Sequence, residues 1–208
     1  MQENNNSYTQ KSLDIESYPS LYLENNILDN TELKDDLNYI KSEIIHSSIE
    51  EEMIMNKINR HGKDIHFNLI YKAINYTDRA EIFHEKCDKA KRTLVLVETI
   101  DERRFGGFTS QSWEGDGVDK NDEEAFIFSL DKSQVYNIIS DEPTIGCYPK
   151  YGPVFLGCQI KVNDNFFVKG GATYKKNINY ATNSDYELND GIKFYGIKDI
   201  EVFEIRLI

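Results

Sequence analysis

From residue 65 onward the chain consists of short apolar segments separated by turn residues, and this pattern restricts the fold more than any other feature. Residues 65–71 alternate apolar and polar side chains, which is typical of a half-buried strand. Residues 93–100 read TLVLVETI, a β-branched run that predicts a buried strand. Further strands are expected at residues 125–130, 135–139, 159–162, 166–168 and 200–208. Many short strands with regular turn signals predict a two-sheet antiparallel β-sandwich.

Turn chemistry and one helical stretch complete this prediction. Residues 163–165, Asn-Asp-Asn, are expected to form the turn of a hairpin. Residues 77–87 predict a short helix that buries Ala80, Phe83 and Cys87 on one face, with Thr77 or Asp78 as its cap. Thirteen Tyr and eleven Phe suit a core between sheets. The fold class is α+β, mainly β, with a few short helices.

The first 64 residues differ from the rest of the chain. Residues 1–26 are polar and lack periodicity, which predicts a disordered tail. Residues 27–62 predict an N-terminal helix, because residues 31–60 contain neither Pro nor Gly. Apolar side chains at helical spacing are Leu33, Leu37, Ile40, Ile44, Ile54 and Ile58, with a neighbouring stripe of Ile45, Ile49 and Met53. The helix is expected to begin at Thr31 and to stop near Gly62.

Three interpretations of this helix remain open. Residues 31–60 pair as a coiled coil and join two copies of the chain, or they pack on the following domain, or they form a solvated spacer. The heptad phase places the polar residues Ser47 and Glu51 at core positions, which weakens a coiled-coil seam.

Charge excludes several classes of partner. The formal net charge is −12, and the first 64 residues carry 13 acidic and 6 basic residues. An acidic surface repels phosphate, so neither nucleic acid nor an anionic membrane surface is expected as a partner. No segment approaches the roughly 20 apolar residues that span a bilayer, and no signal-peptide pattern is present. We therefore expect a cytoplasmic protein without a transmembrane segment.

The three cysteines are the first candidates for chemistry. Cys87 lies on the apolar face of the helix expected at residues 77–87, where a buried small hydrophobe is expected. Cys147 and Cys158 adjoin a stretch rich in Gly and Pro, so we expect them to be partly exposed. A reactive thiolate also needs a neighbouring cation or a helix N-terminus. An odd cysteine count argues against a disulfide framework.

No catalytic, cofactor or metal site is predicted. His84 and Cys87 have the i, i+3 spacing of metal ligands, but no second pair completes a tetrahedral site. Residues 114–124 are rich in carboxylates but lack the register of an EF-hand, so a solvated loop is expected. The Gly pairs at 106–107 and 170–171 are expected to be bulges or close backbone approaches. Nucleotide-binding and nucleophile-elbow motifs are missing.

Six short motifs in order resemble those of the TLDc domain family. The most specific is FGGFTSQSW at residues 105–113, because the family has an aromatic or aliphatic residue, two glycines and an aromatic residue shortly before a Trp. The other five read LIYKA at 69–73, FHEKCD at 83–88, AFIFSL at 125–130, YGPVF at 151–155 and IEVF at 200–203. The resemblance covers residues 65–208. The chain departs from the family pattern at Lys72, where Arg is usual, and at Cys158, where Gly is common.

This resemblance carries expectations about structure. It implies that the aromatic side chains of the motifs form one core between the sheets, and that His84 and Cys87 belong to a packed helix. The aromatic residues are Phe105, Phe108, Trp113, Phe126 and Phe128.

The resemblance also carries expectations about function. It implies a non-catalytic regulatory module linked to resistance to oxidative damage, with no known catalytic residues or cofactor. Several family members bind the vacuolar proton ATPase, so peripheral subunits of that pump are the partner expected here. Two alternatives are a thiol-dependent antioxidant enzyme that uses Cys147 or Cys158, and a homodimeric scaffold joined by a coiled coil of residues 31–60.

Overall fold

The computed structural model describes residues 37–58, 62–157, 160–173 and 179–208. The chain divides into two compact units, Met1–Asp36 and Leu37–Ile208. The tail predicted for residues 1–26 and the start of the predicted helix lie outside the described residues. All that follows concerns the second unit.

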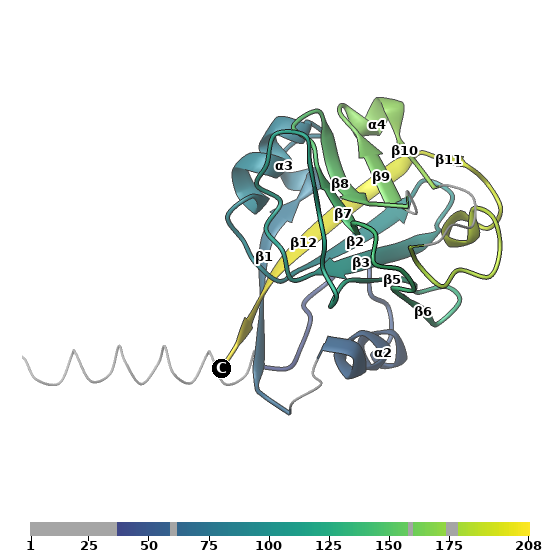
Figure 1. Cartoon of the computed structure of the whole chain (residues 1–208). Helices are drawn as coiled ribbons and strands as arrows, with labels where there is room; N and C mark the ends of the chain where they lie inside the picture. The colour runs from purple at the N-terminus through teal and green to yellow at the C-terminus, as the bar shows by residue number, and fades with distance from the viewer. Residues whose placement is uncertain (1–36, 59–61, 158–159, 174–178) are drawn as a thin grey trace, which may run out of the picture. The chain divides into compact units, whose positions relative to one another are not determined.

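Two antiparallel sheets of six strands each build this unit, which confirms the predicted sandwich (Figure 1). Sheet A contains, in spatial order, β1 (Ile65–Lys72), β12 (Ile197–Leu207), β2 (Thr93–Thr99), β3 (Arg104–Thr109), β5 (Phe126–Ser129) and β6 (Gln134–Asn137). Sheet B contains β11 (Phe194–Tyr195), β10 (Gly171–Ala172), β9 (Ile160–Asn163), β8 (Tyr151–Phe155), β7 (Ile145–Cys147) and β4 (Val118–Lys120). The last strand, β12, lies between the first two strands of the chain, so sheet A closes only when the C-terminal segment is in place.

Short helices connect or cover the strands. They are α2 (Ser48–Ile58), η1 (Ala73–Asn75), α3 (Ala80–Cys87), α4 (Phe166–Lys169) and η2 (Glu187–Asn189). The helix predicted at residues 77–87 is confirmed as α3. The strand predicted at residues 166–168 is wrong, because these residues begin α4. Asn165 adopts a left-handed backbone with a φ of 58°, which turns the chain into a helix, and β9 pairs with β10 instead.

Sheet A is buried on both faces. Val95 and Val97 of β2 pack against sheet B, while Leu94 and Leu96 belong to a second apolar cluster on the opposite face. A strand that is covered on both sides needs no polar face. This burial explains why residues 94–97 form a continuous apolar run. We call the cluster between the sheets the inner core and the cluster on the opposite face the outer core.

The outer core is covered by residues 37–58, which we call the N-terminal segment (Figure 1). Ile40, Ile44, Ile54 and Ile58 are buried there against sheet A. The interpretation that this part of the chain packs on the following domain is therefore confirmed, and the compact unit begins at Leu37 rather than at residue 65. The isoleucines of the proposed coiled-coil seam are already buried within their own chain.

The continuous helix predicted over residues 31–60 is wrong for residues 37–47, which follow an extended and turning path. The backbone N–H of Asn38 donates to the carbonyl of Ile65 at 2.7 Å, so the segment joins the end of β1 instead of a helix. Helix α2 begins only after Ser47, whose Oγ accepts a hydrogen bond from the Glu50 N–H at 3.3 Å. A Ser followed three residues later by Glu is a start signal that competes with helix continuation.

The aromatic motif residues divide between the two cores, so the expectation of one shared core is wrong. Phe105 and Trp113 lie in the inner core. Phe108, Phe126 and Phe128 lie in the outer core under the N-terminal segment. Alternation along β3 and β5 causes this division, because successive side chains point to opposite faces of a sheet.

The glycine pair of β3 makes room for one aromatic ring on each face. A Cβ on Gly106 would collide with the Val95 carbonyl and the Phe128 ring, and a Cβ on Gly107 would lie 2.6–2.8 Å from atoms of the Phe155 ring. The pairing of β3 with β2 and β5 shows no register shift, so the pair serves close approach and not a bulge.

Candidate functional site

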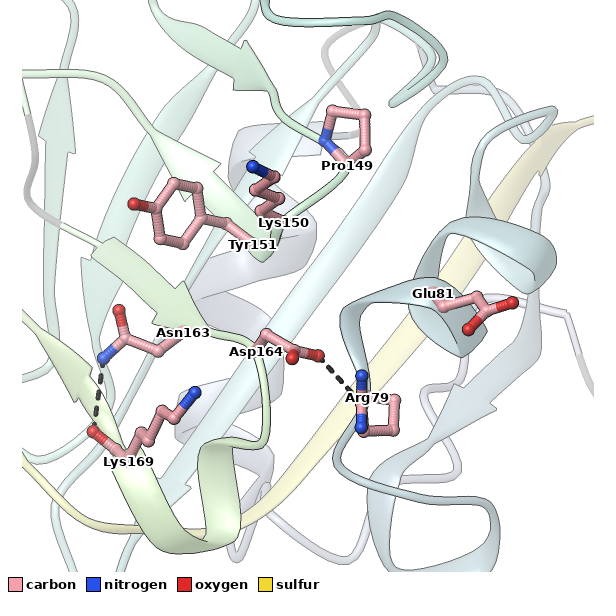
Figure 2. A pocket seen from close by; sticks show the side chains of 8 residues that line it. All are labelled: Arg79, Glu81, Pro149, Lys150, Tyr151, Asn163, Asp164 and Lys169. Atoms are coloured by element: carbon pink, nitrogen blue, oxygen red, sulfur yellow. Dashed lines mark hydrogen bonds and ion pairs between the residues drawn. The ribbon is translucent and has the colours of Figure 1, made fainter.

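A pocket of about 550 Å³ lies between three segments of the chain, and Figure 2 shows the side chains that line it. In Figure 1 the elements that carry these segments, α3, β8, β9 and α4, lie on the opposite side of the domain from α2. The segments are loops: the start of α3, the turn between β7 and β8, and the connection from β9 to α4. Its lining residues are Arg79, Glu81, Pro149, Lys150, Tyr151, Asn163, Asp164 and Lys169. These residues come from three separate stretches of sequence, so the pocket exists only in the folded domain.

Reciprocal helix capping holds two of these loops together. The Asp164 carboxylate accepts hydrogen bonds from the Ala80 N–H at 3.0 Å and from Arg79 Nε at 3.1 Å, so it caps α3. In return, the Asp78 carboxylate accepts a hydrogen bond from the Phe167 N–H at 3.2 Å in α4. The prediction that Thr77 or Asp78 caps α3 is therefore wrong, because the cap comes from a distant loop.

Asp164 is held in its ionised form. The hydrogen bond from the Ala80 N–H and the nearby charges of Arg79 and Lys169 lower its pKa against a smaller opposing effect of burial. A capping carboxylate at the helix start is also favoured by the helix dipole. Asp164 therefore fixes the position of Arg79 at the rim of the pocket.

His84 fixes the third loop to α3. Its Nε2 lies 3.0 Å from the carbonyl oxygens of both Tyr148 and Tyr151, and its Nδ1 lies 2.6 Å from the Asp88 carboxylate. Both ring nitrogens thus face protein acceptors. The resemblance placed His84 in a packed helix, and the structure shows that it also anchors the turn carrying Lys150.

Positive charge gathers around this pocket in a chain that is otherwise acidic. Arg79, Lys150 and Lys169 line it from three elements (Figure 2). A fourth cation, Lys161, lies with its Nζ 3.9 Å from the ring centroid of Tyr151, a cation–π contact with a residue of the pocket wall. Only two lining residues, Glu81 and Asp164, are acidic.

An apolar surface adjoins the cations. Phe167 and Val168 precede Lys169 in α4, and they are 43% and 80% exposed. Pro149 and Tyr151 add apolar surface inside the pocket. A ligand that fits here combines negative charge with apolar groups.

Cys87 and Cys147 are not among the residues that line this pocket, and Cys158 lies outside the described residues. Cys87 and Cys147 are both fully buried, which confirms the prediction for Cys87 and corrects the expectation that Cys147 is partly exposed. Burial raises the pKa of the Cys147 thiol, and Lys120 only partly opposes that effect.

The carboxylate-rich stretch at residues 114–124 has one member that is not solvated. Asp122 is buried and accepts hydrogen bonds from Thr109 Oγ1 at 2.6 Å and from Ser110 Oγ at 2.7 Å. It therefore ties this stretch to the end of β3. The other acidic side chains there are exposed, as expected. Across the described ranges, no group of three or more His, Cys, Asp or Glu side chains is arranged to hold a metal ion.

Comparison with known protein families decides the family. The model of the TLDc domain matches residues 39–206. This chain belongs to the TLDc domain family. The match begins at residue 39, so this TLDc domain includes the N-terminal segment that covers the outer core. A search of curated proteins found no match to the chain.

Family membership agrees with the architecture described above. The most specific motif of this TLDc domain, at residues 105–113, serves packing, because Phe105 and Trp113 fill the inner core and Phe108 the outer core. Among the described residues, every helix is too short or too polar to cross a bilayer.

Sequence reasoning missed the basic pocket. Arg79, Lys150 and Lys169 are exposed single cations in an acidic chain, and nothing in their local sequence sets them apart. The one usable signal is the Asn-Asp-Asn stretch at residues 163–165, which predicts a turn between β9 and the segment that follows it. In the structure its central residue, Asp164, organises the pocket.

Proposed function

We propose that this TLDc domain is a non-catalytic module that binds a protein partner and regulates a vacuolar proton ATPase, as part of resistance to oxidative stress. The family match over residues 39–206 carries this proposal. The resemblance of the six motifs connects the chain with proteins that bind the peripheral subunits of the pump.

The chemistry of the described residues supports binding rather than catalysis. Burial raises the pKa of both Cys87 and Cys147, which keeps these thiols protonated and poor as nucleophiles. Both nitrogens of His84 already face acceptors within the fold. The pocket instead presents charged and apolar groups at the surface, which suits recognition of another protein.

The test is affinity capture with the full chain from an extract of its own cells, analysed by mass spectrometry. We expect enrichment of peripheral subunits of the proton ATPase, and loss of that enrichment when excess untagged chain competes. The full chain is needed because the outer core requires residues 37–58. Capture of no pump subunit under these conditions overturns the proposed partner.

The non-catalytic part of the proposal has its own test. We expect the purified chain to consume no peroxide in the presence of a thiol reductant. Peroxide consumption that disappears in a chain with both Cys147→Ser and Cys158→Ser overturns this part and establishes a thiol enzyme. The buried position of Cys147 makes Cys158 the residue to test singly next.

A further inference from the structure

We propose that the pocket between α3, the β7–β8 turn and the β9–α4 loop docks an acidic peptide segment of the partner protein. This assignment rests on the proposed function and names the surface that performs it. The occupant is a peptide with carboxylates and at least one apolar side chain next to them.

Charge complementarity is the first support. Three cations line the pocket against two carboxylates, whereas the whole chain carries a formal net charge of −12. Asp164 is already engaged with Arg79 and the Ala80 N–H, so its charge is largely satisfied within the fold. Lys150 and Lys169 are exposed at the pocket and available to carboxylates of a partner. A local basic surface on an acidic protein steers acidic ligands to one place.

The apolar rim distinguishes a peptide from a phosphate-rich ligand. Phe167 and Val168 are exposed directly beside Lys169, and a peptide side chain can cover them while neighbouring carboxylates meet the lysines. Nucleic acid or an anionic membrane needs a broad basic surface, and this chain is acidic beyond the pocket. The small basic area therefore favours a short acidic segment.

A rigid frame is the second support. Asp164 caps α3, Asp78 caps α4, and His84 holds the β7–β8 turn, so all three loops of the pocket are fixed before a ligand arrives. A preformed surface loses little conformational entropy on binding, which favours affinity. The side chains of Lys150 and Lys169 make none of these frame hydrogen bonds, and Lys169 adds only a nearby charge to Asp164, so we expect their substitution to leave the fold intact.

The experiment measures fluorescence anisotropy of a short labelled peptide in which Glu and Asp alternate with Leu and Phe. The full chain is compared with a double variant, Lys150→Glu with Lys169→Glu. The matched control is Lys89→Glu with Lys91→Glu, which makes the same change in net charge at exposed positions that do not line the pocket. Thermal unfolding of all three chains checks that each is folded.

We expect the peptide to bind the full chain, with affinity that falls as salt is added. The pocket variant should lose affinity about tenfold or more, and the control variant should change it by less than about twofold. A peptide with Lys in place of the acids should not bind. Equal losses in both variants, or no binding to the full chain, overturn the assignment.

Other occupants give different results in the same set of proteins. Binding to vesicles that contain phosphatidylserine, without binding to the peptide, overturns the proposal and assigns the pocket to a membrane surface. If the full chain is a dimer and the pocket variant is a monomer, the proposal is overturned and the occupant is a second copy of the chain. Pump capture that is equal for the full chain and the pocket variant overturns this surface and leaves the proposed function standing. Peptide binding without any pump capture overturns the pump and leaves the surface standing.

Discussion

The two faces of sheet A are covered by different kinds of structure. The inner face packs on sheet B through aromatic contacts, such as the edge-to-face contact of Phe105 in β3 with Tyr195 in β11, whose ring centroids lie 5.2 Å apart. Trp113, in the loop after β3, meets Phe83 of α3 and Phe155 of β8 edge to face, with centroids 5.6 Å apart in each case. The outer face packs on the N-terminal segment through the side chains of isoleucines such as Ile54. Both faces bury large apolar side chains, but only the inner one is covered by a second sheet.

Ion pairs and hydrogen bonds add to the apolar packing that holds the N-terminal segment, which we also call the outer cover, on sheet A. Arg104 of β3 donates two hydrogen bonds to the Glu50 carboxylate of α2, at 2.8 and 3.0 Å. On the other side, the Glu201 carboxylate of β12 accepts bonds from Ser42 Oγ at 2.5 Å and from Lys72 Nζ at 2.7 Å. Because these contacts are made by a few side chains, substitutions in them should weaken the packing of the N-terminal segment without disturbing the inner core.

Removal of the outer cover should have the largest effect. A chain that starts at residue 65 loses Ile40, Ile44, Ile54 and Ile58, each of which contributes about 1.5–3 kcal/mol by burial. Their sum is comparable with the total stability of about 5–15 kcal/mol that is usual for a domain. We expect this chain to aggregate or to lack a cooperative thermal transition, measured by circular dichroism.

The matched control is a chain that starts at residue 37 and keeps the whole second unit. It should unfold cooperatively, within a few degrees of the full chain. If the chain from residue 65 unfolds as cooperatively as the control, the outer core contributes little to stability. The inner core then supplies most of the stability of sheet A, which contradicts the prediction.

The glycine pair of β3 allows the two faces to be compared one residue apart. Gly106→Ala should cost about 3 kcal/mol of unfolding free energy, because the new Cβ meets the Val95 carbonyl of β2, which cannot move without breaking the sheet. Gly107→Ala should cost less, about 1–2 kcal/mol, because its Cβ meets only the far end of the Phe155 side chain and no backbone atom of a neighbouring strand. Urea unfolding of both variants measures the difference, and a larger cost for Gly107→Ala would contradict this explanation.

The same comparison explains which parts of the fold the sequence could reveal. Strands of sheet A have local signals, since alternation and β-branched runs such as residues 93–100 are set by neighbouring residues. The arrangement of three layers, with sheet A between sheet B and the N-terminal segment, has no such signal. A strand that is buried on both faces has the same apolar sequence whether a sheet or a helix covers it. The apolar spacing of residues 31–60 predicts one helix, but the hydrogen bond from the Glu50 N–H to Ser47 Oγ starts α2 only at Ser48.

The pocket could not be predicted for a related reason. Asp164 acts on α3, which lies more than eighty residues earlier in the chain, through its hydrogen bond to Ala80. Lys150 and Lys169 line the same pocket only because β8 and β9 pair in sheet B. Motif reasoning found the residues that fill the cores, since packing restricts them most, whereas isolated surface cations leave no pattern in the sequence.

The Glu50–Arg104 pair should have an intermediate effect on the outer cover. Glu50→Gln keeps the shape of the side chain but removes its charge, and should cost about 2 kcal/mol at neutral pH. Burial raises the pKa of Glu50, but the hydrogen bonds from Arg104 and the His46 N–H, with the charge of Arg104, lower it more, to below the ordinary value of 4.5. A carboxylate whose pKa is lower in the folded state than in the unfolded state adds stability at pH values above its unfolded pKa. This stability is lost as the pH falls through the folded pKa.

Urea unfolding at several pH values checks this prediction. The difference in unfolding free energy between the unchanged chain and Glu50→Gln should be largest at neutral pH and should decrease below pH 4.5. A matched control is Glu52→Gln, an exposed carboxylate of the same helix, which should change stability little at any pH. A difference that stays constant in acid would mean that the lost stability comes from packing and not from the ion pair.

Asp199 should have the smallest effect, and one of the opposite sign. Its carboxylate lies 3.5 Å from Lys72 Nζ, which already pairs with Glu201 at 2.7 Å and with Glu43 at 2.9 Å. Burial, with the neighbouring charge of Glu201, raises the Asp199 pKa above 3.8 against the opposing effects of Lys72 and two backbone N–H groups. A raised carboxylate pKa means that the folded state favours the neutral form, so this contribution is lost as the pH rises through the folded pKa.

Asp199→Asn should therefore increase the unfolding free energy at neutral pH, by up to about 1 kcal/mol, and should give no gain below pH 3.8. The amide oxygen can still accept the N–H of Ile200, which the carboxylate now accepts at 2.8 Å. Glu201→Gln is the contrasting change, because it removes the negative charge nearest to Lys72 and replaces one of the two acceptor oxygens of Glu201 by a donor, and it should destabilise. Equal destabilisation by both variants would show that Lys72 needs all of its carboxylates, and the outer cover would then depend on the whole charge cluster rather than on Glu201.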